Sequence, residues 1–317
     1  MHFWNAMSEY ITHSLFALDC RRLALRFGFG GARIAAAFEH ETERLFLGAR
    51  SSRGRWGSVP LARAVRDGAE PQARRDLGFL LGLRTHDAAD RQFKPIYRTT
   101  DTGYLLTPER DGPSRISVAQ DVYLLRRFGR ASDGGPFPDD LLEAGDGGAD
   151  DLLTDVSADG IARDLLALGW PISPGNAELS FAERETFYVS RARYLAMWAA
   201  DPAAVEARVR GEWLYRAESP LVRVAERLRA GAPVDDGSYA SAAARLPESC
   251  HYARALARLK GDMEALAAFL DGTIDEDALA QAFQTEVNHV PDHYEDALGD
   301  ARAEDALRAS WHATGGL

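Results

Sequence analysis

One segment of the sequence combines residues that could do chemistry with the spacing of a helix. FLLGLRTHDAADRQFKPIYR, residues 79–98, places His86 and Asp90 four positions apart inside an apolar run. A helix would present both side chains on the same face as Phe79 and Phe93. That face should be buried, and a buried carboxylate without a partner is costly. The pair therefore predicts either metal ligands or an imidazole–carboxylate contact within a core.

A second histidine lies on the inward side of another predicted helix. In YITHSLFALDCRRLALRF, residues 10–27, His13 shares one helical face with Phe16, Cys20 and Leu23. By itself His13 would be interpreted as a core or cap residue. Together with a second imidazole and a carboxylate it completes three protein ligands, which suffice for one zinc ion with an open coordination position.

Three segments of the chain resemble the bacterial zinc-dependent phospholipase C family. YITHSLFALD is similar to the family's N-terminal motif, in which a Thr-His pair opens the first helix and the histidine, here His13, binds zinc. FLLGLRTHDAADRQFKP is similar to the central helix, whose order of Gly, His-x-x-x-Asp and Pro is matched from Gly82 to Pro95. ISVAQDVYLLRRF is similar to a later helix in which an acidic residue, here Asp121, precedes Tyr-Leu-Leu.

The resemblance extends over about residues 9–130. It implies an all-α fold, a cluster of zinc ions and cleavage of phosphodiester bonds in phospholipids. It also implies that His13, His86 and Asp90 bind zinc. We therefore expect a metal-dependent phosphoester hydrolase that acts on a phosphoester or a phospholipid-like small molecule.

The chain also departs from the family pattern. Lys94 stands where the family has a histidine before the proline, and Pro113 and Ser117 fall near the place of a His-x-x-x-Glu pair. The sequence thus predicts a reduced site, with one zinc ion unless other residues contribute. Lys94 is a candidate catalytic residue that steadies charge on a phosphoryl group, or else forms a salt bridge with Asp90 one turn away. Asp121 is a candidate catalytic-site acid that supports the ligands without binding the metal.

The missing ligands leave a non-catalytic alternative open. In that case the chain is a helical protein that kept the scaffold, lost the chemistry and serves in binding or assembly. His289 and His293, in NHVPDHYED, could replace a lost ligand if that segment folds back onto the first half. His40, which stands among acids, is expected to face water.

A third alternative is an HD-type phosphohydrolase, because His86 is followed directly by an aspartate. The residues that would form its site are His13 or His40, His86 with Asp87, and Asp121. This function requires Asp87 to face the metal. The helical phase and the arginines at neighbouring positions predict instead that the Asp87 side chain is solvated.

The composition restricts the class of protein. The chain has 317 residues and a formal net charge of −11, which argues against a broad nucleic-acid surface because such surfaces need clustered positive charge. Cys20 and Cys250 are expected to be reduced thiols. The sequence contains no recognisable signal peptide and no apolar run near the roughly 18 residues of a transmembrane helix. We therefore expect a cytoplasmic protein, of open oligomeric state.

Helical periodicity recurs along the chain, which predicts an all-α, multi-helix bundle resembling the zinc-dependent phospholipase C fold, with additional C-terminal helices. Residues 131–151, rich in Gly, Pro and Asp, predict a linker or loop between a helical core over 1–130 and a helical C-terminal half over 152–317 packed on it. The predicted helices are 10–27 with Thr12 as N-cap, 32–49, 71–93 with an end at Pro95, 116–129, 180–200, 203–217, 220–230, 248–270, 275–288 and 292–311. The aromatic residues expected to form a core stripe are Tyr188, Tyr194, Trp198, Trp213 and Tyr215.

Overall fold

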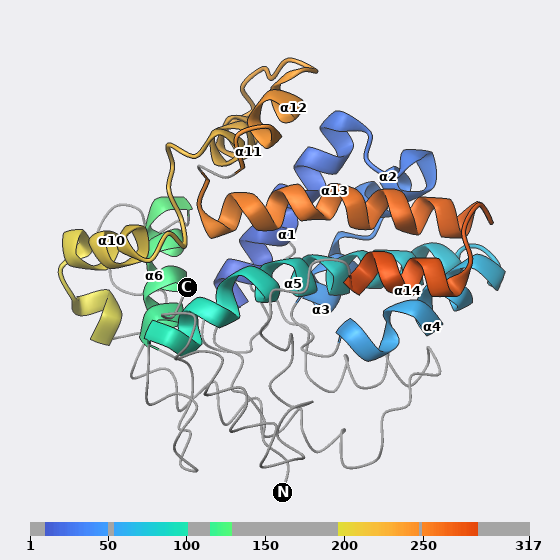
Figure 1. Ribbon diagram of the computed structural model, residues 1–317, viewed down its shortest axis with the longest axis horizontal. Helices are drawn as coiled ribbons and strands as arrows, with labels where there is room; N and C mark the ends of the chain where they lie inside the picture. Colours follow the sequence, from blue (N-terminus) through green and yellow to red (C-terminus); the bar gives the residue numbers. More distant parts are fainter. Residues whose placement is uncertain (1–9, 50–53, 101–114, 129–195, 247–248, 285–317) are drawn as a thin grey trace, which may run out of the picture.

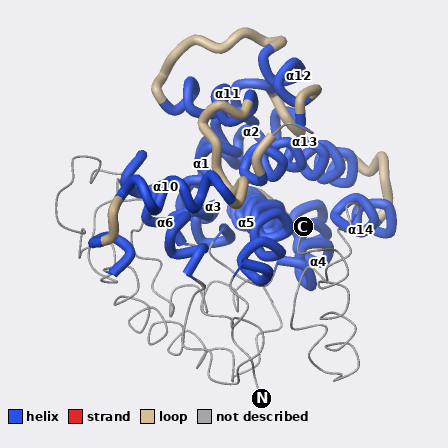
Figure 2. The backbone as a smooth tube through the Cα atoms, turned by 60° about the vertical axis from the view of Figure 1, so that its left-hand side comes forward, coloured by secondary structure: helices blue, strands red, loops and turns tan. Residues whose placement is uncertain are grey.

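The computed structural model describes residues 10–49, 54–100, 115–128, 196–246 and 249–284. Within these ranges the regular elements are all helical, as Figure 2 shows, and the predicted all-α class is confirmed. The helices are α1 (Tyr10–Phe27), α2 (Gly31–His40), α3 (Thr42–Ala49), α4 (Gly54–Asp67), α5 (Gln72–Thr100), α6 (Arg115–Phe128), α10 (Pro202–Gly211), α11 (Pro220–Arg229), α12 (Ser238–Ala243), α13 (His251–Leu270) and α14 (Glu276–Gln284).

The 29-residue helix α5 is the centre of the fold. It contacts α1, α2, α3, α4, α6 and α13, and in Figure 1 it crosses the middle of the molecule below α13. Every residue from 76 to 93 is buried, so this stretch of the helix has no solvent-facing side. A helix enclosed in this way carries the polar residues of all its faces into the interior. Each of those residues then needs a partner.

Helices α3 and α5 cross in backbone contact because a glycine on each faces the other. A Cβ atom at Gly48 would lie 2.1 Å from the Phe79 carbonyl oxygen, and one at Gly82 would lie 2.1 Å from the Leu45 carbonyl oxygen. Neither position has room for a side chain. The close approach brings the carbonyl group of Ala49, the last residue of α3, against the next turn of α5.

The described helices after residue 196 share the core of the first six helices. Buried apolar side chains from α1 through α14 form one cluster. Within it the rings of Phe16 on α1, Phe93 on α5 and Tyr252 on α13 lie 5.3–6.5 Å apart, centroid to centroid. The predicted linker over 131–151 lies outside the described residues, and the division of the chain there stays a prediction.

Two helix boundaries predicted for the first half were wrong. The helix predicted over 32–49 is interrupted at Glu41, which leaves the helical conformation (φ −117°, ψ 43°) between α2 and α3. The helix predicted to end at Pro95 continues to Thr100. Proline cannot donate the hydrogen bond of a helix interior, but Tyr97, just beyond it, is buried in the core and holds the last turns in place.

The structure also contains helices that periodicity did not predict, namely α4 and the six-residue α12. The helices α10, α11, α13 and α14 overlap the predicted helices 203–217, 220–230, 248–270 and 275–288. The predicted helix 292–311 and most of 180–200 lie outside the described residues.

The predicted aromatic core stripe is only partly present. Tyr215 is fully buried, whereas Trp213 is 42% exposed. Trp198 is partly buried against the core, with the Arg126 guanidinium 4.7 Å from the centroid of its ring. Tyr188 and Tyr194 lie outside the described residues.

Cys20 and Cys250 are buried free thiols, as expected, and burial raises the pKa of the Cys20 thiol well above its usual value. In the part of the chain that the structure describes, none of the helices has the length and apolar character needed to cross a membrane.

Candidate metal centre

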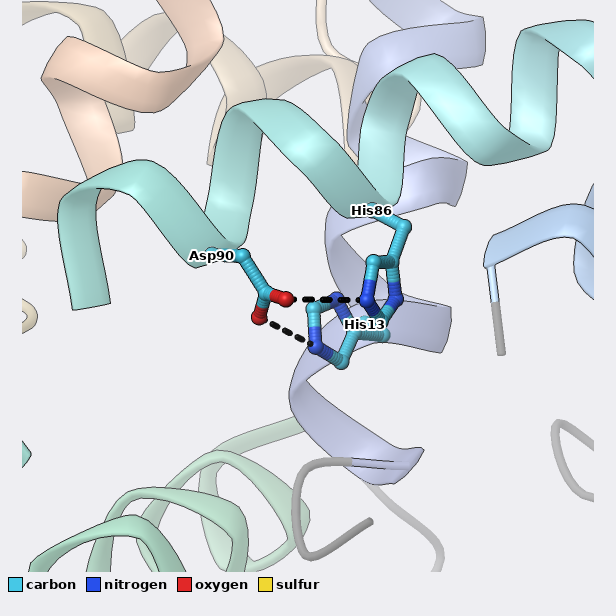
Figure 3. A group of neighbouring side chains, drawn as sticks. All are labelled: His13, His86 and Asp90. Carbon is cyan, nitrogen blue, oxygen red and sulfur yellow. Dashed lines mark ion pairs between the residues drawn. The ribbon is translucent and has the colours of Figure 1, made fainter. Parts of the chain in front are cut away.

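Two imidazoles and one carboxylate meet where α1 crosses α5. His13 comes from α1, and His86 and Asp90 come from successive turns of α5 (Figure 3). His13 Nε2 lies 3.3 Å from Asp90 Oδ1, and His86 Nε2 lies 2.9 Å from Asp90 Oδ2. One ligand atom from each residue lies within 4.8 Å of the other two. All three residues are at most 5% exposed, so the group is part of the interior.

The orientation of His86 is fixed from the far side of its ring. Its Nδ1 lies 2.9 Å from the Ala49 carbonyl oxygen, which can only accept, so Nδ1 carries a hydrogen and donates it. In the neutral ring Nε2 then carries the lone pair, on the side of Asp90. A histidine that donates to a backbone carbonyl through one nitrogen and directs the other to a shared point has the orientation typical of metal ligands.

The contacts around Asp90 are short but are not directed as hydrogen bonds. His86 Nε2 and both Asp90 carboxylate oxygens are buried and make no hydrogen bond in the described part of the chain. A proton on His86 Nε2 would lie in the plane of the ring, and the carboxylate 2.9 Å away is not in line with that direction. A metal ion need not lie on the line between His86 Nε2 and the carboxylate. From a position to one side of that line it can contact both groups with bonds of about 2 Å. The separations of 2.9 and 3.3 Å are those of neighbouring ligands around one such ion.

The two imidazole rings are stacked. Their centroids are 4.2 Å apart and their planes differ by 17°. Because His86 is anchored to Ala49, the stacking also restricts the ring of His13. The donor set of two nitrogens and one carboxylate suits zinc and other first-row transition metals better than magnesium or calcium. The residues present therefore fit a small transition-metal cation.

A lysine ammonium lies against the same carboxylate. Lys94 Nζ is 2.7 Å from Asp90 Oδ2, one helical turn further along α5. Burial raises the pKa of the Asp90 carboxyl, but the electrostatic interactions with His86 and Lys94 and the close contact with His13 outweigh it. The pKa of Asp90 is held well below its usual value, so the carboxylate is ionised. Of the two roles predicted for Lys94, the salt bridge with Asp90 is the one observed.

Asp121 on α6 holds the beginning of α1. Its Oδ1 accepts hydrogen bonds from the Thr12 backbone N–H, 2.8 Å away, and from the Thr12 hydroxyl. Thr12 lies inside α1, so its predicted role as N-cap was wrong; Asp121 satisfies a first-turn amide from another helix. Asp121 does not belong to the group of ligand atoms around His13. It positions the turn that carries His13, and its predicted catalytic role stays a prediction.

The prediction that Asp87 faces water was wrong. Asp87 is 2% exposed, and its Oδ2 accepts a hydrogen bond from the Arg84 guanidinium at 2.7 Å. The prediction assumed a helix with one buried face, whereas α5 is enclosed on all sides. Asp87 therefore belongs to an internal ion pair and not to the group with His86 and Asp90. An HD-type phosphohydrolase would need Asp87 at the metal, and that alternative stays a prediction.

Of the three remaining candidate histidines, His40 is in the part of the chain that the structure describes. His40 is exposed at the end of α2, as expected, with Nε2 3.9 Å from Glu39. His289 and His293 lie outside the described residues. The feature that sequence reasoning missed is the Ala49 carbonyl group. The signal that could have found it is the pair of glycines, Gly48 and Gly82, since small residues on two helices permit such a crossing.

Comparisons of the chain with protein-family models, with curated proteins and with solved structures found no match. The resemblance to the zinc-dependent phospholipases C stays a prediction, and the candidate site stands on its own geometry.

Proposed function

We propose that the chain is a metal-dependent phosphoester hydrolase in which His13, His86 and Asp90 hold a zinc ion. The observation that carries the proposal is the set of lone pairs on His86 Nε2 and the Asp90 carboxylate, buried at one point without hydrogen bonds. Three protein ligands leave coordination positions open, which is the arrangement of catalytic rather than structural zinc sites. The three segments that resemble those of zinc-dependent phospholipases C, in the same order along the chain, support a phosphoester as substrate.

The residues around the proposed site have separable roles. When bound, zinc supplies a Lewis acid that polarises a phosphoryl oxygen and makes water a better nucleophile. His86 is kept in its binding orientation by the Ala49 carbonyl, and Asp121 holds the turn of His13. Lys94 brings a positive charge next to Asp90, where it can also meet the anionic oxygens of a phosphoester. The two buried free thiols agree with a reducing compartment such as the cytoplasm.

The test is metal analysis of the full chain, purified without a histidine tag, together with assays on bis(p-nitrophenyl) phosphate, p-nitrophenyl phosphate and phosphatidylcholine vesicles. We expect about one equivalent of zinc and turnover of at least one substrate. His86→Ala should lose both, while His40→Ala, which removes an exposed histidine, should keep both. No bound metal after zinc is supplied would exclude the proposal. Bound iron in place of zinc would exclude the zinc hydrolase and indicate an iron site, since two histidines and one carboxylate also suit non-haem iron.

A second candidate function is a non-catalytic helical protein that binds or assembles with a partner. The observation that favours it is the Lys94 ammonium, which already neutralises Asp90 without a metal. In that case His86→Ala should lower the stability of the fold and change no hydrolytic activity. Turnover that is abolished by His86→Ala and retained by His40→Ala would exclude this second function.

A further inference from the structure

Lys94 and His86 approach the same atom of the proposed site. Lys94 Nζ lies 2.7 Å from Asp90 Oδ2, and His86 Nε2 lies 2.9 Å from that oxygen. His13 Nε2 is 3.3 Å from the other oxygen, Oδ1. The single negative charge of this carboxylate is therefore already balanced by an ammonium at the position where His86 and Asp90 would jointly bind a cation.

An added divalent ion would meet that ammonium across one carboxylate. The residues His13, His86 and Asp90 are at most 5% exposed, so water screens the charges poorly and repulsion between two cations a few ångströms apart is strong. An ion that used Oδ2 would meet the Lys94 ammonium on the same oxygen, and the repulsion between the two charges would favour displacement of Lys94. An ion that used only Oδ1 would be bound by a carboxylate whose charge is shared with Lys94.

The Lys94 side chain is partly exposed to solvent. It is 16% exposed, in contrast to the buried Arg84 of the same helix, whose side chain is 1% exposed. A lysine has a long flexible stem that can carry its ammonium to the surface. If Lys94 left Asp90, its ammonium could be solvated at the surface, so it would not become a buried charge without a partner.

We propose that Lys94 is a built-in competitor for the metal, which neutralises Asp90 in the empty site and must leave Oδ2 before an ion is held tightly. The wild-type site would then bind zinc weakly enough to fill and empty with the supply of the ion. This inference rests on the proposed function, because it assumes that the three ligands bind a metal.

The experiment is calorimetric titration of the full-length chain, freed of metal, with Zn²⁺. Lys94→Met removes the ammonium and keeps the apolar stem, and it should bind zinc at least about 10-fold more tightly than the wild type, because the ion no longer meets a second positive charge across the carboxylate. Lys94→Gln provides a second neutral variant with the same expected direction, should the methionine variant fold poorly. Lys94→Arg keeps the charge and should not bind more tightly than the wild type. The matched control is Lys260→Met, which removes an exposed lysine paired with Glu264 on α13 and should leave zinc binding unchanged.

The outcomes separate this inference from the function on which it rests. Equal or weaker zinc binding by both neutral variants, with clear binding by the wild type, would overturn the competitor role and leave the metal site standing. Zinc binding by the neutral variants alone would support the competitor role strongly. No zinc binding by any of these proteins would overturn both proposals.

Discussion

Two buried polar clusters lie on the same stretch of α5, and they are completed in different ways. In the first, which we call the arginine cluster, Arg84 donates to Asp87 at 2.7 Å and to Asp262 of α13 at 2.7 and 3.2 Å. In the second, His86 and Asp90 lie as close to each other, yet neither His86 Nε2 nor the carboxylate oxygens make a hydrogen bond in the described part of the chain.

The difference separates a fully paired internal ion pair from a group of residues that could hold a metal ion. The planar guanidinium of Arg84 offers several donors in fixed directions, so one side chain serves two carboxylates. It also lies 4.0 Å from the ring centroid of Phe283, which covers it. The cluster of Asp90 has the burial but lacks this directed pairing. Burial alone therefore does not separate the two clusters, whereas the direction of their contacts does.

The largest effect is expected in the arginine cluster. Arg84→Ala leaves the buried carboxylates of Asp87 and Asp262 without their main donor and should lower the free energy of unfolding by about 3–5 kcal/mol. Urea denaturation followed by circular dichroism measures this. As a control, Arg63→Ala breaks the exposed ion pair with Glu276 and should cause no resolvable change. Equal effects of the two substitutions would contradict the view that the arginine cluster holds α5 and α13 together.

Zinc should act on the other cluster alone. At a free zinc concentration of 100 times the Kd, binding to the folded state should raise the free energy of unfolding by about 2.7 kcal/mol. The same addition should have little effect on Asp90→Asn, which lacks the anionic ligand. Arg84→Ala, although less stable, should gain as much from zinc as the wild type does. A gain that is lost in Arg84→Ala would show that the two clusters are not independent.

The crossing of α3 and α5 should control the orientation of His86. Gly82→Ala places a Cβ atom against the Leu45 carbonyl and should lower the free energy of unfolding by about 1–3 kcal/mol. By moving the Ala49 carbonyl away from His86 it should also weaken zinc binding. The control is Gly261→Ala in α13, where no atom lies within 4 Å of an added Cβ; it should increase stability slightly. Unchanged zinc affinity in folded Gly82→Ala would contradict the view that the crossing of α3 and α5 controls the orientation of His86.

The smallest effect is expected from the acid that was predicted to be catalytic. Asp121→Ala removes the acceptor of the Thr12 amide and should cost about 1 kcal/mol of stability, as the loss of a helix cap does. Hydrolytic activity should fall only as far as zinc affinity falls, so saturating zinc should restore it. Loss of turnover that zinc does not restore would place Asp121 in the chemistry after all.

The candidate ligands could be predicted from sequence because their positions depend on local rules. The spacing of His86 and Asp90 places them on one helical face whatever surrounds the helix, and His13 occupies a similar inward position on its own helix. The all-α class follows from the same periodicity. These predictions needed no knowledge of how the helices pack.

The features that sequence reasoning missed depend on packing. Asp87 was expected in water because an amphipathic helix has one buried face, but α5 is enclosed by helices from both halves of the chain. Arg84, which pairs with Asp87, also pairs with Asp262, which lies 178 positions further along the chain, and no local pattern connects the two. Pro95 failed to end the helix because contacts of the buried Tyr97 outweigh a local preference. The Ala49 carbonyl became a partner of His86 through a crossing that only the three-dimensional arrangement reveals.

The enclosure of α5 also fixes its rotation about its own axis. One side of the helix is tied to α13 through Arg84 and Asp262, and another meets α1 at His13. A single residue inserted between Arg84 and His86 would turn everything after it by about 100° relative to Arg84. Arg84 could then no longer pair with Asp262 while Asp90 contacts His13. Among the described residues, the dozen that start at Arg84 should form the stretch least able to accept a change in length.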